Sequence, residues 1–212
     1  MSDLPSKQFA LLAALFGIVG SITLIGSFMI NPGPPPGLSP EALVAWAAPR
    51  EGVILLGGWT QGIGSLLTVL FALALVHAGG DASGFAGTVT KLASATILAV
   101  SLIEVTFYLA GAQALATGDK ALGITSTQLI KAVQHVFLIA PAVLIPLGIV
   151  LARTGVLGPG FVYSAIAIGV TLQVLGIAGL FRPLQNIVDL VLIVQGLWFV
   201  SASVAFVVRQ RS

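Results

Sequence analysis

The chain has 212 residues, of which 57% are hydrophobic and 8% are charged, and its mean hydropathy is +1.08. Soluble domains carry about 25% charged residues, so this composition excludes a water-soluble globule and predicts a polytopic membrane protein in contact with the lipid bilayer. The lack of cysteine excludes disulfides and thiolate chemistry, and a net charge of +2 without a basic run gives no indication of a nucleic-acid partner.

Six apolar stretches follow one another, each long enough to cross a hydrocarbon core of about 30 Å. We predict transmembrane helices over residues of about 8–30, 53–78, 86–116, 127–152, 159–181 and 184–208. The connections between them are too short to form a soluble domain. Residues 1–212 are therefore expected to form a single all-α transmembrane domain.

An even number of spans places both termini on the same side of the membrane. The basic residues expected on the side of the termini are Lys7, Lys91, Arg153, Arg209 and Arg211, and those on the other side are Arg50, Lys120, Lys131 and Arg182. Cytoplasmic loops carry the excess of lysine and arginine. This distribution favours cytoplasmic termini in a bacterial inner membrane, with the opposite orientation as the alternative.

The longest connection, residues 31–52, begins with a Pro/Gly spacer that cannot be helical. Ser39, Pro40 and Glu41 then supply a helix N-cap, a proline at the first helical position and an acid in the first turn. We predict a short interfacial helix anchored by Trp46 on the outer surface. It either covers the outer half of the protein as a lid or only packs and anchors there.

Small residues and prolines mark the spans where close packing or a bend is expected. Gly58 and Gly62 form a GxxxG pattern, and glycines such as Gly169 let neighbouring helices approach closely. Glycine-rich faces of this kind also predict that the chain can form oligomers. Pro141 and Pro146 interrupt the predicted fourth helix and are expected to bend it.

Nearly all strongly polar side chains within the predicted spans fall in the half of the bilayer nearest residues 31–52. They are Trp59, Gln61, Glu104, Tyr108, Lys131, Gln134, His135, Gln173, Gln185, Asn186 and Asp189. Polar residues in spans usually face the interior of the bundle. We therefore predict one polar pocket that opens towards the side of residues 31–52.

Within this set, Glu104, Asp189 and His135 are the predicted catalytic residues. Glu104 lies deepest, with no lysine or arginine expected at its level, so it should be neutral near pH 7 and able to donate a proton. Asp189 or His135 would take a proton back. The alternatives are structural: Asp189 paired with Lys131 or Arg182, His135 as an interhelical hydrogen-bond donor, and Lys131 extended to the interface.

The remaining residues of the set are predicted to bind substrate: Trp59, Gln61, Tyr108, Lys131, Gln134, Gln173, Gln185 and Asn186. No metal or cofactor is expected. His77 is expected at the inner end of the second span and His135 in the outer half of the fourth, so they cannot bind one metal ion, and no nucleotide-binding or hydrolase motif occurs.

The junction Arg153-Thr154-Gly155-Val156-Leu157, together with the Pro-rich loop, resembles a broad group of small six-helix bacterial membrane proteins whose activities are largely uncharacterised. Members share the R-T-G-V-L turn before the fifth helix. This chain departs from their usual Pro-Arg-Trp continuation, because Gly158-Pro159-Gly160 follows the turn. The resemblance implies a six-helix fold and no particular site residues.

Three functions are compatible with these features. The first is a membrane-embedded acid–base enzyme, similar in architecture to small membrane-bound terpene cyclases, that isomerises or cyclises an apolar isoprenoid- or lipid-like substrate. In it, Trp59, Phe107 and Tyr108 would shield a cation. The second is a small-molecule transporter or the substrate-binding membrane subunit of one. The third is a structural or partner-binding membrane protein.

Overall fold

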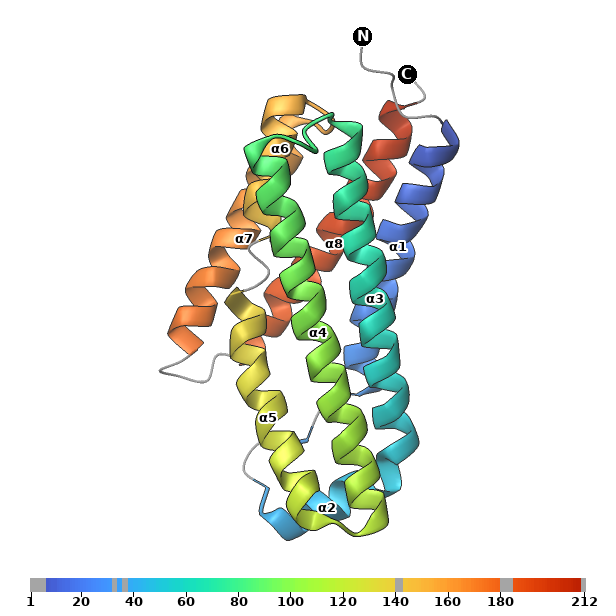
Figure 1. Cartoon of the computed structure of the whole chain (residues 1–212), viewed down its shortest axis with the longest axis vertical. Coiled ribbons are helices and arrows are strands. Elements are labelled where there is room, and N and C mark those ends of the chain that lie inside the picture. The colour runs from blue at the N-terminus through green and yellow to red at the C-terminus, as the bar shows by residue number, and fades with distance from the viewer. Residues whose placement is uncertain (1–6, 32–33, 36–37, 140–142, 180–184, 211–212) are drawn as a thin grey trace.

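The helices of the chain form an elongated bundle (Figure 1). A computed structural model describes residues 7–31, 34–35, 38–139, 143–179 and 185–210, and their regular structure is entirely helical, which confirms the all-α prediction. In chain order the elements are α1 (Lys7–Ile30), α2 (Pro40–Ala47), the 3-10 turn η1 (Ala48–Arg50), α3 (Glu51–Ala78), α4 (Phe85–Thr117), α5 (Lys120–Ile139), α6 (Leu144–Thr154), α7 (Pro159–Gly179) and α8 (Gln185–Arg209).

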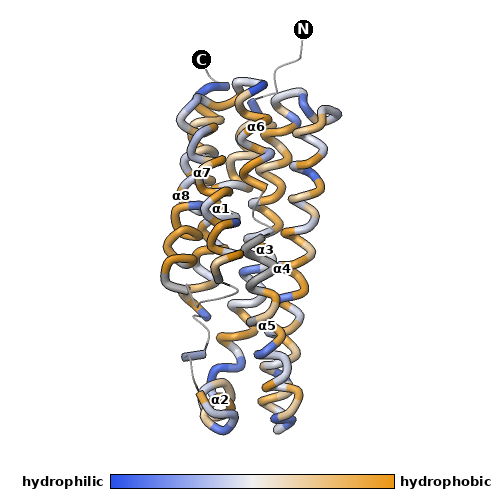
Figure 2. Tube along the Cα trace, turned by 90° about the vertical axis from the view of Figure 1, so that its left-hand side faces the viewer, coloured by the Kyte–Doolittle hydropathy of each residue, from blue (hydrophilic) through white to orange (hydrophobic). Residues whose placement is uncertain are grey.

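Within the described residues, five helical stretches are long and apolar enough to cross a membrane, which supports a multi-pass membrane protein. They are Lys7–Ile30, Pro40–Ala78, Phe85–Thr117, Pro159–Ala178 and Leu190–Arg209. Hydrophilic residues gather mainly around α2 and near the termini, whereas apolar residues cover most of the length between (Figure 2). Both termini lie at the same end of the bundle, opposite α2 (Figure 1).

The fourth predicted span, 127–152, corresponds to two helices, α5 and α6. The first of them begins seven residues earlier than expected, at Lys120, because Asp119 caps it: the Leu122 backbone N–H donates to Asp119 Oδ1 at 3.0 Å. The second has 11 residues, about 16 Å at 1.5 Å per residue, which is too short to cross a bilayer alone. Pro141 lies outside the described residues, and Pro146 is buried within α6.

The short helix predicted after the Pro-rich segment is α2, and it closes one end of the bundle (Figure 1). The Ser39 hydroxyl accepts a hydrogen bond from the Ala42 backbone N–H at 3.2 Å, as expected of an N-cap. Ala47, a buried residue of α2, belongs to an apolar cluster with Ile54 of α3 and Leu115 of α4. This contact explains why α2 rests against the helix ends.

Helices α1 and α3 approach each other closely, backbone to backbone. Gly64 of α3 lies against the backbone of α1: a methyl group there would sit 2.6 Å from the Leu24 nitrogen and 2.9 Å from the Gly20 carbonyl oxygen. The glycines of the predicted GxxxG face α4 instead, where Gly62 has side-chain neighbours at ordinary distances. Small residues thus hold α3 close to α1 on one side and let it meet α4 on the other.

Candidate functional site

The centre of the site is a contact between α3 and α4. Gln61 and Glu104 are each 4% exposed, and Gln61 Nε2 donates a hydrogen bond to Glu104 Oε2 at 2.5 Å. The two residues come from helices whose facing positions are small or apolar, so the carboxyl is removed from lipid. The prediction that Glu104 is a buried interior carboxyl is therefore confirmed.

A second polar contact lies one turn further along the same interface. Ser65 and Ser101 are both buried, and their hydroxyl oxygens lie 2.8 Å apart in a hydrogen bond. Residues 61 and 65 of α3 are four apart, and residues 101 and 104 of α4 are three apart, so each pair shares one helix face. The two hydrogen bonds thus form consecutive polar contacts across the α3–α4 interface.

Buried hydroxyl groups continue along α4 beyond these contacts. Ser94 and Thr90 are fully buried and follow Ser101 towards the end of the bundle that holds the termini. The Thr90 hydroxyl donates to the Ala86 carbonyl at 2.8 Å. Among the described residues, buried Ser94 Oγ has no hydrogen-bond partner. One face of α4 is therefore polar over much of its length.

Of the other predicted site residues that the structure describes, one lies near Glu104 and two do not. Tyr108 lies one turn from Glu104 on the same face of α4, where it is partly buried and close to Gly58. Trp59 is 62% exposed on the outside of α3, so the structure does not bring its ring to the Glu104 site. Gln173 is partly buried on α7, a helix that packs on α5, α6 and α8.

The other predicted site residues have side chains outside the described part of the structure. They are Lys131, Gln134 and His135 in α5, and Gln185, Asn186 and Asp189 in α8. Their convergence on Glu104 therefore stays a prediction.

The backbone register of α5 against α4 bears on the surroundings of Glu104. Gly111 of α4 meets Ser126, and Leu115 meets Gly123, so the two helices run antiparallel with a known offset. Extending this offset brings the turn that contains Lys131 to the level of Glu104. The Lys131 side chain lies outside the described part of the structure, so the expectation that no basic residue shares the level of Glu104 stays a prediction.

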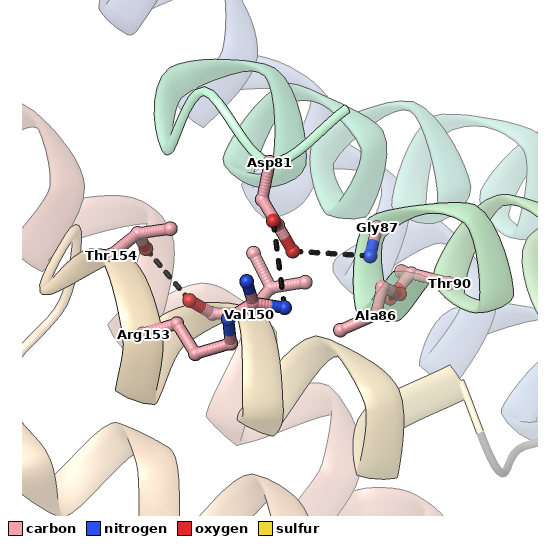
Figure 3. A network of polar contacts seen from close by, with 7 residues as sticks. All are labelled: Asp81, Ala86, Gly87, Thr90, Val150, Arg153 and Thr154. Atoms are coloured by element: carbon pink, nitrogen blue, oxygen red, sulfur yellow. Dashed lines mark hydrogen bonds and ion pairs between the residues drawn. The ribbon is translucent and has the colours of Figure 1, made fainter. Parts of the chain in front are cut away.

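Sequence reasoning overlooked a polar cluster at the end of the bundle that holds the termini. Asp81 accepts a hydrogen bond from the Gly87 backbone N–H through Oδ2 at 3.2 Å, and its Oδ1 lies 3.7 Å from Arg153 Nη1 (Figure 3). Thr154 lies beside this ion pair and donates to the Val150 carbonyl. The cluster fastens the α3–α4 loop to the end of α6, which indicates a structural role.

Gln195 of α8 was also overlooked, although a glutamine in the middle of an apolar span was a visible signal. It is 5% exposed, and its Oε1 atom has no hydrogen-bond partner among the described residues. Within the same residues, no three His, Asp or Glu side chains are grouped so that they could hold a metal ion. Among the described residues, the carboxyl, amide and hydroxyl groups at the α3–α4 interface are those of Glu104, Gln61, Ser65 and Ser101.

Comparisons with protein-family models, with curated proteins and with solved structures found no match to this chain.

Proposed function

We propose that this chain is a membrane-embedded acid–base enzyme in which Glu104 donates a proton to an apolar, isoprenoid- or lipid-like substrate. The observation that carries the proposal is a 4% exposed carboxyl inside a span–span interface, held by the Gln61 amide. A carboxyl at such a position costs several kcal/mol unless it is neutral or compensated, about 2.5–3.5 kcal/mol on insertion scales. A role in proton transfer explains why an apolar residue does not stand there.

The proposed reaction needs only proton transfer. The alkene π electrons of the substrate take the proton of the Glu104 carboxyl, which forms a C–H bond and leaves a cation on the neighbouring carbon. A base, Asp189 or His135, removes a proton from an adjacent carbon, and the product is an isomer or a cyclised form of the substrate. The carboxylate that Glu104 becomes is stabilised by the Gln61 N–H, because hydrogen bonds to charged acceptors are the stronger ones.

The proposal includes a topology with six crossings and cytoplasmic termini. We take α5 and α6 as the two halves of a sixth, interrupted span, since they occupy opposite halves of the bundle (Figure 1). At the end of the bundle that holds the termini, the described basic residues are Lys7, Lys91, Arg153 and Arg209, and the described acidic residue is Asp81. At the other end, the described basic residues are Arg50 and Lys120, and the described acidic residues are Glu41, Glu51 and Asp119. A positive end of this kind is typical of the cytoplasmic side of an inner-membrane protein.

A proton-coupled carrier for a small molecule is the second candidate. It is favoured by the buried hydroxyls of Ser101, Ser94 and Thr90, which extend the polar face of α4 past Glu104. A carrier needs polar groups through both halves of the membrane, whereas an enzyme that draws its substrate from the lipid does not.

Mass spectrometry of the molecules that purify with the protein in mild detergent separates these functions. Wild type is compared with Glu104→Gln, and Glu51→Gln serves as a control at a carboxyl outside the α3–α4 site. The enzyme proposal predicts that one isoprenoid or lipid accumulates unreacted only on Glu104→Gln. A water-soluble metabolite lost from Glu104→Gln would favour the carrier instead. Identical ligands and thermal stability in all three proteins would leave a structural role and overturn both proposals.

A further inference from the structure

A small cavity of about 30 Å³ lies between α1, α3, α4 and α8, close to the Ser65–Ser101 hydrogen bond, and Val143 also lines it. Apolar side chains such as Val69, Ile97 and Phe199 form most of its wall. Three polar residues also line it, and they are Ser65, Thr68 and Gln195. This volume is large enough for at least one water molecule, since a cavity of roughly 10–15 Å³ on the same measure already accommodates one.

The polar groups around this cavity have unused hydrogen-bonding capacity. Gln195 is 95% buried, and its Oε1 accepts no hydrogen bond from the described residues. Only one of the two hydroxyl hydrogens of Ser65 and Ser101 is used in their mutual contact. The Thr68 hydroxyl donates to the Gly64 carbonyl at 2.8 Å and keeps lone pairs that can accept. Gln195, whose Oε1 atom lacks a donor among the described residues, therefore lines a cavity whose hydroxyl groups can donate and accept further hydrogen bonds.

We propose that this cavity is a binding site for a single water molecule, which joins Gln195 of α8 to Ser65 and Thr68 of α3. The water donates one hydrogen to Gln195 Oε1 and the other to a hydroxyl oxygen of α3. Buried waters usually make about three hydrogen bonds to groups that are otherwise unsatisfied, and this site offers that number.

The proposed water connects α8 to the interface that carries Glu104. Ser65 is four residues from Gln61, so the water lies about one helical turn from the Gln61–Glu104 hydrogen bond along α3. The same helix α8 also carries Asp189, six residues before Gln195. The site does not depend on proton transfer by Glu104, and it forms equally in an enzyme, a carrier or a structural protein.

A double-mutant cycle on the purified full-length protein tests the water bridge. Gln195→Leu, Ser65→Ala and the double variant are compared by apparent Tm in detergent. We expect Gln195→Leu to lower Tm by about 2–5 °C, the size of one lost hydrogen bond in a chain of this length. The loss should shrink by at least half in the Ser65→Ala background, because the same water serves both residues. Gln173→Leu on α7 is the matched control, and its effect should simply add to that of Ser65→Ala.

Two results would overturn the proposal. Gln195→Leu would raise Tm if the amide oxygen is unsatisfied and the cavity dry, because removal of such a group stabilises. Fully additive losses would exclude a shared partner. If Gln195→Leu fails to fold, a high-resolution crystal structure of the wild type decides the question. A cavity without density would overturn the proposal, whereas water density within hydrogen-bond distance of Gln195 Oε1 would support it.

Discussion

Replacement of Gly64 by alanine is expected to force α1 and α3 apart. The added methyl carbon would lie 2.6 Å from the Leu24 nitrogen, 2.8 Å from the Leu24 Cα and 2.9 Å from the Gly20 carbonyl oxygen. All three are backbone atoms, so no side-chain rotation relieves the contact. Because carbon contacts are favourable only near 3.5–4.0 Å, the helix axes must separate by roughly 1 Å.

The size of the effect follows from two opposing terms. Overpacking of a close contact costs about 1–3 kcal/mol, whereas replacement of glycine by alanine within a helix returns about 0.5–1 kcal/mol. We expect a net loss of about 1–2 kcal/mol, which lowers Tm by about 2–8 °C in a chain of this length.

The assay is thermal unfolding in a single detergent, with Gly62→Ala as the matched control. Gly62 lies in the same helix, but its nearest neighbours are side-chain atoms of Val105 and Leu102 at 3.6 and 3.7 Å. Gly62→Ala should therefore leave Tm unchanged or raise it slightly. Equal losses in the two variants would refute the reasoning, because they would show that the α1–α3 contact is no tighter than the α3–α4 contact.

Three further predictions concern the site, the polar cluster and the topology. Gln61→Leu removes the hydrogen bond that Gln61 donates to the buried Glu104 carboxyl and should lower the free energy of unfolding by about 1–3 kcal/mol. An unchanged midpoint of chemical unfolding would contradict this contact. Asp81→Ala should lower Tm more than Arg153→Ala, because Asp81 also accepts a hydrogen bond from the Gly87 backbone N–H, whereas the Arg153 side chain is 56% exposed. Equal losses of Tm would argue against the Asp81–Gly87 hydrogen bond. The chain has no native cysteine, so single cysteines at Ser83 and Ser39 report topology directly. In intact cells an impermeant maleimide should label only the cysteine at Ser39, and the reverse pattern would invert the proposed orientation.

The positions of the helices followed largely from hydropathy, because apolar runs of about 20 residues have few structural alternatives in this composition. Local capping residues explain the finer agreement at α2, where Ser39 and Pro40 set the helix start. The early start of α5 shows the limit of this reasoning. Asp119 caps a helix whose first turns are too polar to register as part of an apolar span.

The rotation of each helix was harder to predict. In a membrane both the buried face and the lipid face are apolar, so hydropathy does not separate them. Gln61 and Glu104 were recognisable as interior residues because both are strongly polar. Trp59 carries no such signal, because an indole is equally compatible with the lipid face, where this ring is largely exposed.

Which residues lie beside Glu104 depends on the register between neighbouring helices, and the sequence of one helix does not show that register. The turn that contains Lys131 lies level with Glu104 because α5 begins at Lys120 and packs through Gly123 and Ser126. Gln195 belongs to the interior because α8 meets α3 beside a buried aromatic contact between Phe71 and Phe199. Such neighbours follow from packing between distant segments rather than from local pattern.

The most direct test of proton transfer by Glu104 is deuterium labelling of the membrane lipids. Cells that express either wild type or Glu104→Gln are disrupted, and their membranes are incubated in D₂O and extracted for mass spectrometry. An acid that protonates carbon exchanges with solvent, so wild type should yield an isoprenoid or lipid with one additional, non-exchangeable deuterium, and Glu104→Gln should not. Equal deuterium on carbon in both samples, or none in wild type, would contradict the assignment of Glu104 as the proton donor.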